Sequence, residues 1–471
     1  MTTMTGTTSE TRGAQRGTRR AVLRAARLGT GIAAGAALAA CSAPSATSGP
    51  GAGDGAAPSR STAPVSVRLI ERLDQESQAL DARLPVFRTQ FPNITVEREA
   101  VPGAELIPKL QTMAAADTMP DNAHSFLGSQ FYHNFSATGA FLNIDSRLAR
   151  DKVDIKAWFP EVIDIMKIDG RLFGLPYKGQ ILSAGFFYNI TLFEKRGLPL
   201  PSDSWTLDDL IAAAQRLTER AGSDVTQYGY AVNSWGGEAH VAHLRATNGD
   251  AYSKDGKKAT MDTPEVLETL QWYENLINRE RIMHPINNAA ASFVEGKVAM
   301  IGRTYFNFKS VELLPKVGDR FKWDGTMMPK HPRTGKRGGM FAGDAQSIAK
   351  SSKAPDAAFE LLKWLTDKEF GVALGLQTKG STTLGGRPDV WADPRILNHP
   401  DMPRRAQETQ LKSVQEIKEP YSAPANFRAP EVEAIRDPAT RQITDGQAKA
   451  DPAFLRSLNA QMQSVMDLPR P

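Results

Sequence analysis

The sequence contains a single cysteine, Cys41, among 471 residues. No disulfide bond can form within one chain, so the fold has to be stabilised by its hydrophobic core. The charge-free stretch at residues 28–40 is only thirteen residues long. It is too short to span about 30 Å of hydrocarbon as a mature helix. A chain of this length is expected to form two domains or one body with two lobes.

Beyond the first forty residues there is no surplus of charge of either sign. The formal net charge of +5 arises almost wholly in residues 1–40, which carry six arginines and one acid. The remainder holds equal numbers of basic and acidic residues. Binding to a polyanion is driven largely by release of its counterions, which requires an excess of cations on the protein. The balance argues against a nucleic acid as partner.

Two sequence motifs of hydrolases are absent, Gly-x-Ser-x-Gly and His-Glu-x-x-His. The close histidine pair His240 and His243 has no adjacent acid, and this spacing does not favour a metal site. We therefore expect no catalytic residues, no cofactor and no metal. A carboxylate pair for glycoside hydrolysis leaves no local signature, because its separation is set in space. A secreted hydrolase of carbohydrates stays open as the alternative.

The N-terminal segment has the features of an export signal. The residues Thr18–Arg24, TRRAVLR, precede the apolar stretch 28–40, and Leu38-Ala-Ala-Cys41 follows. A basic region, a short apolar run and small residues before a cleavage site form the secretory pattern. The pair Arg19-Arg20 resembles a twin-arginine signal, with the general secretory route as the alternative. We predict a signal peptide over residues 1–40.

Cys41 is the expected site of lipid attachment. Leu-Ala-Ala-Cys resembles a lipobox, in which the cysteine is lipidated and the chain is cut just before it, whereas the alternative is a buried structural cysteine. Residues 42–64 are mostly Ser, Ala, Pro, Gly and Thr, a composition that cannot bury a core. We predict that residues 41–64 form a flexible linker to a lipid on the extracellular face of the cell membrane, or in the periplasm. Two or more acyl chains would give stable tethering.

Strand and helix patterns alternate after this linker. Val65–Ile70 is rich in branched residues and predicts a strand. Apolar residues at helical spacing over 80–91 predict a helix that ends at Pro92-Asn93, and Ile94–Val96 predicts the next strand. A second helix over 106–113 follows. This order is typical of an α/β fold.

Further elements follow from local signals. Asp169-Gly170 predicts a hairpin turn, and Thr206 with Asp209 predicts a capping box. The remaining predictions are two short strands within 166–177, strands over 181–189, 228–232 and 298–301, and helices over 207–217, 264–277, 355–365 and 452–466.

Five segments occur in an order that is informative as a set. They are DGRLFGLPY at 169–177, YNITLFEKRG at 188–197, SWTLDDL at 204–210, FVEGKVAM at 293–300 and KAPDAAFELLKW at 353–364. In this order they resemble the extracellular solute-binding proteins of ABC importers, in particular the sugar-binding group known as family 1. The resemblance covers roughly residues 65–390.

The resemblance implies a type II periplasmic-binding-protein-like fold, with two α/β lobes joined by a hinge and a cleft between them. By analogy, lobe 1 takes in 65–178 plus 338–380, and lobe 2 takes in 179–337 plus 381–471. It also implies a monomer that binds a small-molecule solute, expected to be a sugar, and delivers it to the ABC permease transmembrane subunits. A polyamine, a metal chelate or a peptide is the alternative solute. A surface adhesin or sensor on the same fold is a further alternative.

The resemblance implies which residues could face the cleft, and open α/β sheets bind ligands in the loops just after strands. Aromatic rings can cover the faces of a sugar, and planar polar groups can bind its hydroxyls. The candidates are Arg72, Gln75, His124, Ser125, Phe126, Tyr177, Lys178, Trp235, Tyr305, Phe306, Asp344 and Arg387. Arg72 could instead cap a helix, Phe126 and Tyr177 could pack in the core, Asp344 could belong to a surface turn, and Arg387 could be a helix-terminal charge.

Trp235 is the strongest stacking candidate, because glycines follow it and let a ligand come close. We expect Trp235→Ala to weaken solute binding far more than it lowers the melting temperature. Titration calorimetry and thermal melting of the same preparation would check this. Equal loss of both would assign Trp235 to the core instead.

Overall fold

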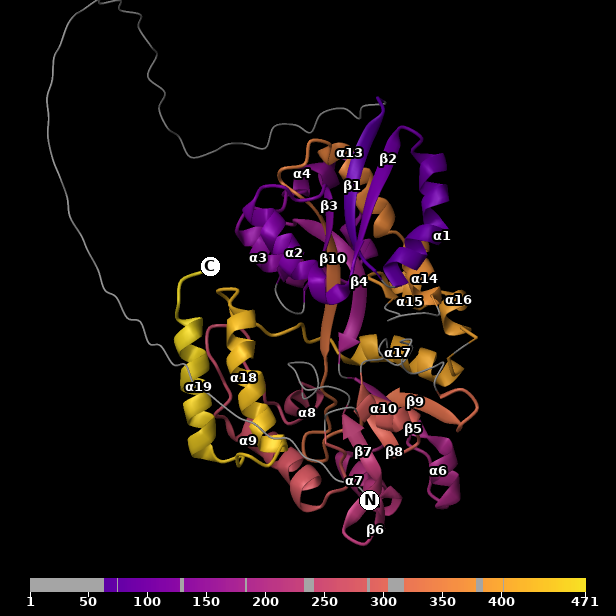
Figure 1. The fold of residues 1–471 in the computed structure, drawn as a ribbon, viewed down its shortest axis with the longest axis vertical. Coiled ribbons are helices and arrows are strands. Elements are labelled where there is room, and N and C mark those ends of the chain that lie inside the picture. Colours follow the sequence, from indigo (N-terminus) through magenta and orange to yellow (C-terminus); the bar gives the residue numbers. More distant parts are fainter. Residues whose placement is uncertain are drawn as a thin grey trace, which may run out of the picture. The chain divides into compact units, whose positions relative to one another are not determined.

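The computed structural model describes residues 63–73, 75–127, 131–182, 184–232, 241–285, 289–303, 317–377, 384–400 and 402–471. The predicted signal peptide, Cys41 and nearly all of the predicted linker lie outside these ranges. The described elements form two β-sheets, each with its own helices (Figure 1). None of the helices in these ranges is long and apolar enough to cross a membrane.

The first sheet has the strand order β11-β4-β10-β3-β1-β2. Its strands are β1 (Val65–Arg72), β2 (Ile94–Val101), β3 (Asn122–Phe126), β4 (Gly174–Leu182), β10 (Met340–Ile348) and β11 (Leu384–Gly385). β1 runs parallel to β2 and β3, whereas β10 lies antiparallel between β3 and β4. The carboxyl ends of β1, β3 and β4 therefore meet at one edge, together with the first half of β10.

Ten helices accompany the first sheet in the described part of the chain. They are α1 (Gln75–Gln90), α2 (Gly103–Ala115), α3 (Phe131–Ala137), α4 (Asp145–Arg150), η1 (Ile155–Ala157), α5 (Pro160–Met166), α13 (Pro355–Leu365), α14 (Lys368–Leu376), α15 (Pro388–Trp391) and α16 (Pro394–Leu397). Their apolar faces join the strands in one continuous core. Trp158 lies in this core with its polar atom bonded, because its Nε1 donates to the Thr366 carbonyl over 3.1 Å.

The second sheet has the strand order β6-β7-β8-β5-β9. Its strands are β5 (Gly185–Asn189), β6 (Glu219–Ala221), β7 (Asp224–Val232), β8 (Val298–Arg303) and β9 (Trp323–Met327). The remaining helices are α6 (Ile190–Lys195), α7 (Leu207–Leu217), α8 (Val241–Ala246), α9 (Pro264–Glu274), η2 (Asn275–Arg279), α10 (Ala289–Val294), α17 (Arg404–Glu416), α18 (Ala429–Thr444) and α19 (Pro452–Met466).

Helix α17 contributes to the packing of both sheets. It lies against β9, and Ala406 near its start belongs to the same apolar cluster as Phe187 of β5. Val414 near its end, and Ile417 just after it, belong to the core of the first sheet. One helix therefore carries residues of two cores.

The segment between β9 and β10 is held by directional contacts. Arg337 donates from Nε to the Met328 carbonyl over 2.8 Å, and from Nη1 to Glu416 of α17 over 2.9 Å. The next residue, Gly338, lies so close to α8 that an added Cβ would be 1.8 Å from the Ala242 carbonyl oxygen. Only glycine fits this approach.

Several sequence predictions are confirmed. The helices at 207–217, 355–365 and 452–466 have the predicted bounds. The capping box also forms, because the Thr206 hydroxyl accepts from the Asp209 amide, and the Asp209 carboxylate accepts from the Thr206 amide.

The predicted hairpin turn at Asp169-Gly170 is confirmed, because both residues have positive φ and the antiparallel bridge between Ile168 and Arg171 closes the turn. The two short strands predicted within 166–177 are wrong, because only this isolated bridge forms and the chain from Gly174 on belongs to β4, which pairs with β10. The predicted single strand over 181–189 is wrong, because the structure has two strands there, β4 and β5, in different sheets.

The predicted lobe boundaries stay predictions. β4 reaches Leu182, and β11 at 384–385 pairs with β4.

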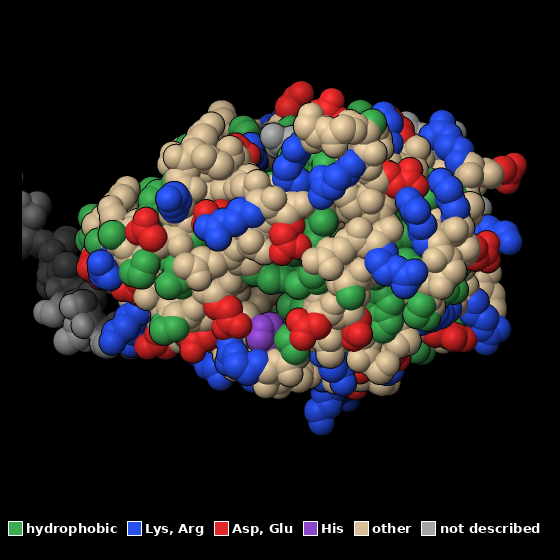
Figure 2. Space-filling view, turned by 90° about the horizontal axis from the view of Figure 1, so that it is seen from below, with side chains coloured by type: hydrophobic (Ala, Val, Ile, Leu, Met, Phe, Trp, Pro, Cys, Tyr) green, Lys and Arg blue, Asp and Glu red, His purple; other side chains and the backbone are tan. Residues whose placement is uncertain are grey.

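The face shown in Figure 2 mixes basic and acidic side chains, with small hydrophobic groups of atoms between them. No single sign of charge dominates it, in keeping with the balance in the sequence beyond residue 40. Such a mixture gives no extended attraction for a polyanion on this face.

Candidate functional site

Four charged side chains meet in the first sheet where β1 and β3 end, beside the middle of β4 and β10. Glu76 comes from α1, His124 from β3, Lys178 from β4 and Asp344 from β10. We call these four residues the charge cluster. Register brings them together, because Asp344 pairs with Phe126 on one side and with Lys178 on the other. The cluster is enclosed, since the exposed side-chain fraction is 0% for Glu76 and His124, 1% for Lys178 and 8% for Asp344.

Positive and negative charges alternate around the cluster. His124 Nδ1 lies 3.0 Å from Glu76 Oε2, and His124 Nε2 lies 3.2 Å from Asp344 Oδ2. Lys178 Nζ hydrogen-bonds Glu76 Oε1 and lies 3.8 Å from Asp344 Oδ2. Each carboxylate therefore contacts both cations, and each cation contacts both carboxylates. This arrangement offsets the large cost of removing the four charges from water.

Arg72, the last residue of β1, borders the charge cluster. Its backbone amide donates to Glu76 Oε2 over 3.3 Å, and its guanidinium lies 5.6 Å from the centre of the Phe126 ring. The His124 ring is 4.9 Å from Phe126. A Cβ at Gly103, in the first turn of α2, would come within 3.2 Å of Arg72 Nε, so α2 also packs closely on this side chain.

The contacts within the cluster determine which groups are ionised. Burial alone raises the pKa of Glu76, but the charges of His124 and Lys178 outweigh it and hold this pKa far below its usual range. Burial likewise opposes ionisation of Asp344, yet the hydrogen bond and charge of His124, with Lys178 and Arg72, lower its pKa. Burial lowers the pKa of His124, but Glu76 and Asp344 raise it above its usual value. These directions favour two carboxylates facing a protonated imidazole.

The structure brings together several of the residues predicted from the sequence. Arg72, His124, Phe126, Lys178 and Asp344 lie in or beside the charge cluster. Their selection as ligand-binding residues stays a prediction.

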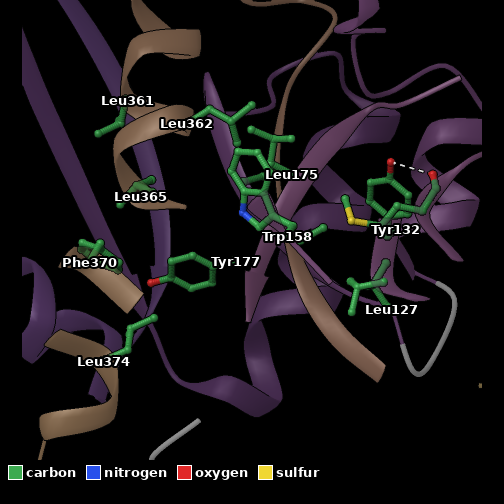
Figure 3. Close-up of a cluster of buried hydrophobic side chains, with 14 of the residues drawn as sticks. Leu127, Tyr132, Trp158, Leu175, Tyr177, Leu361, Leu362, Leu365, Phe370 and Leu374 are labelled. Atoms are coloured by element: carbon green, nitrogen blue, oxygen red, sulfur yellow. Dashed lines mark hydrogen bonds between the residues drawn. The ribbon is translucent and has the colours of Figure 1, made fainter. Parts of the chain in front are cut away.

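Tyr177 lies between the cluster and the core. Its ring is 5.5 Å from His124 and 5.7 Å from Phe370, and it is 1% exposed. Figure 3 shows the Tyr177 ring among Leu365, Phe370 and Leu374. Ser125 is also buried, and strand alternation places it on the opposite face of β3 from His124.

The guanidinium of Arg387 contacts residues outside the charge cluster. Its guanidinium makes two hydrogen bonds to Asp389, of 3.0 and 2.8 Å, and lies 5.4 Å from the Trp158 ring. It stands immediately before α15. Trp235, Tyr305, Phe306 and the side chain of Gln75 lie outside the described residues.

Glu76 was missed by sequence reasoning, although it is the most connected acid of the cluster. An acid in the first turn of a helix is ordinarily explained by the helix dipole. The available signal was its position four residues after Arg72, in the first turn of the helix that follows β1. Among the described residues, no group of three or more His, Cys, Asp and Glu side chains is arranged to hold a metal ion.

The protonated state of His124 predicts a dependence of stability on pH. The pKa of His124 is raised in the folded state, so its protonated ring contributes to the free energy of unfolding. This contribution is fully present below about pH 6.5, the pKa of histidine in the unfolded chain, and it is lost as pH rises through the folded pKa. In His124→Gln, we expect this alkaline loss of unfolding free energy to be absent. Urea unfolding between about pH 6 and pH 9 measures it. If the free energy of unfolding changed with pH in the same way in wild type and variant, the ion pairing of His124 would be contradicted.

Two solved structures resemble this fold. The ABC substrate-binding protein of Listeria monocytogenes, in complex with cycloalternan, matches with a TM-score of 0.73 and 19% identity, over 85% of this chain and 98% of that chain. The cyclic alpha-maltosyl-1,6-maltose binding protein of Arthrobacter globiformis matches with a TM-score of 0.70 and 20% identity, over 86% and 99%. Together with the two mixed sheets, these matches confirm the predicted fold, a type II periplasmic-binding-protein fold with two α/β lobes.

Sequence comparisons reach the same family. A Brucella abortus protein described as a binding protein is 26% identical over 293 residues, which are 60% of this chain and 67% of that protein. The family of bacterial extracellular solute-binding proteins matches residues 74–371, which is more than half of the chain. The chain therefore belongs to the family of bacterial extracellular solute-binding proteins.

Proposed function

We propose that this protein is the substrate-binding subunit of an ABC importer and that its solute is a sugar or an oligosaccharide. The proposal rests on the match to the family and on the fold that the chain shares with solved proteins in complex with sugars. Besides the Listeria protein, a structurally similar protein from Thermotoga maritima was solved with maltose, and a further similar protein was solved with mannotriose. Family and fold are those of binding proteins, so we propose binding without hydrolysis.

The proposed mechanism is closure of two lobes over the solute. A solute that contacts both lobes binds the closed form more tightly than the open form, and it thereby shifts the population toward closure. Equal affinity for both forms would shift nothing. The closed form is then the one that the permease recognises, and no covalent step is needed.

The proposed solute site combines the edge of the first sheet with aromatic residues of the second lobe. Asp344 is the least enclosed member of the charge cluster, and Arg72 ends β1 beside it. A carboxylate and a guanidinium at one edge can bind neighbouring sugar hydroxyls. Trp235, with Tyr305 or Phe306, would cover the apolar faces of the rings.

We further propose that the protein works as a monomer outside the cell membrane, attached only through lipid on Cys41. The family is extracellular, and the leader and linker described from the sequence agree with export. The mixed charge on the face in Figure 2 supports a neutral solute better than a nucleic acid.

A panel of candidate solutes tests the sugar assignment. Purified residues 65–471 are heated with glucose, maltose, maltotriose, mannotriose, spermidine or a tripeptide, and the melting temperature is recorded. We expect stabilisation by at least one sugar, because ligand that binds only the folded state raises the melting temperature. Stabilisation by spermidine or the peptide alone would overturn the assignment. Chromatography of the sugars afterwards would reveal hydrolysis, if the protein were an enzyme.

Replacement of Cys41 tests the anchor. We expect Cys41→Ser to move the protein from the membrane fraction to the soluble fraction, because a serine hydroxyl cannot replace the thiol that takes the lipid. Fractionation and immunoblotting of expressing cells measure the distribution. Ser42→Ala is the matched control and should stay with the membrane. A Cys41→Ser protein that remains in the membrane fraction would refute lipid anchoring at this residue.

A further inference from the structure

The carboxylate of Glu76 connects three separate strands. Its Oε2 accepts from the backbone amide of Arg72 at the end of β1 over 3.3 Å, and it contacts His124 Nδ1 of β3 over 3.0 Å. Its Oε1 bonds Lys178 Nζ of β4. His124 and Lys178 are 48 and 102 residues away along the chain, so Glu76 joins distant segments at one point.

Stability alone does not account for such an arrangement. A buried ion pair often contributes no more to stability than well-packed apolar residues of the same volume, because desolvation offsets the attraction. Directional bonds to a charged group do fix the rotamers of their partners, which apolar packing does less specifically. One partner of Glu76, Arg72, belongs to the proposed solute site, and the other two, His124 and Lys178, contact its carboxylate Asp344.

We propose that Glu76 is the positioning residue of the solute site, fixing the end of β1 and the side chains of His124 and Lys178. This proposal rests on the proposed function. Through His124, Glu76 also determines the place of Asp344, whose Oδ2 lies 3.2 Å from His124 Nε2. Glu76 itself does not touch solute, because its side chain is fully enclosed.

Glu76→Gln provides a specific test because glutamine keeps the shape and removes the charge. One oxygen of the side chain becomes an amide nitrogen, which only donates and would face either Lys178 Nζ or His124 Nδ1, both of which are donors. The charged groups that face His124 are Glu76 from α1, Asp344 from β10, Lys178 from β4 and Arg72 from β1. Loss of one of two carboxylates should therefore let His124 release its proton at lower pH.

The matched control is Glu105→Gln. Glu105 is an exposed glutamate in the first turn of α2, as Glu76 is a glutamate in the first turn of α1. Both substitutions remove one negative charge from a helix N-terminus in the same lobe. Only Glu76→Gln changes the charge cluster.

The experiment combines two measurements on wild type, Glu76→Gln and Glu105→Gln. Calorimetry gives Kd for maltose, maltotriose and mannotriose at pH 7, and NMR follows the His124 ring signals between pH 5 and 9. For Glu76→Gln we expect a rise in Kd of about tenfold or more and a His124 titration at lower pH than in wild type. Glu105→Gln should match wild type in both.

The outcomes separate the possible roles. A Glu76→Gln protein that melts at lower temperature but keeps its Kd and its His124 titration would overturn the proposal and leave a purely structural glutamate. If Glu76→Gln does not fold, Glu76→Asp keeps the charge but shortens its reach, and an unchanged Kd there would also overturn it. A wild type that binds none of these sugars counts against the proposed function alone. The His124 titration then still decides whether Glu76 holds the cluster.

Discussion

The first lobe depends on the alternation of charge among Glu76, His124, Lys178 and Asp344. Each ion removed from water costs several kcal/mol unless it meets an opposite charge, and here each of the four meets two. The four residues come from four separate elements. The cluster can therefore close only when α1, β3, β4 and β10 have all reached their final register, which makes assembly of the sheet and assembly of the site one event.

Sheet topology explains why residues so far apart share this edge. β10 returns antiparallel between β3 and β4, and its register shifts between Asp344 and Ala345. The irregularity falls at the residue that contacts His124 and Lys178. Irregularities of this kind redirect a side chain at the end of a ladder. The late part of the sequence thus supplies the second carboxylate of a cluster whose other members come from the first 178 residues.

Sequence signals predicted the elements whose determinants are local. Thr206 with Asp209 caps α7, so the start of this helix could be located from neighbouring residues. The passage from β4 to β5 could not be located, because apolar residues continue on both sides of it. Nothing in a short window indicates which of two sheets a buried strand will join.

The residues of the candidate site also differ in whether local sequence or distant contacts determine them. Its position after the first predicted strand, together with the family resemblance, identified Arg72, and the resemblance identified His124 and Lys178, which the structure places within β3 and β4. Glu76 depends on contacts 48 and 102 residues away, and such pairing leaves no periodicity to detect. The aromatic residues proposed for the second lobe stay predictions.

Helix α17 has a consequence for how the two lobes lose their structure. Ala406 packs with Phe187 in the second lobe, and Val414 packs in the core of the first. Melting of either core would withdraw packing from this helix and so from the other core. The two lobes are therefore thermodynamically coupled through α17. The chain should unfold with more cooperativity than two independent domains would have.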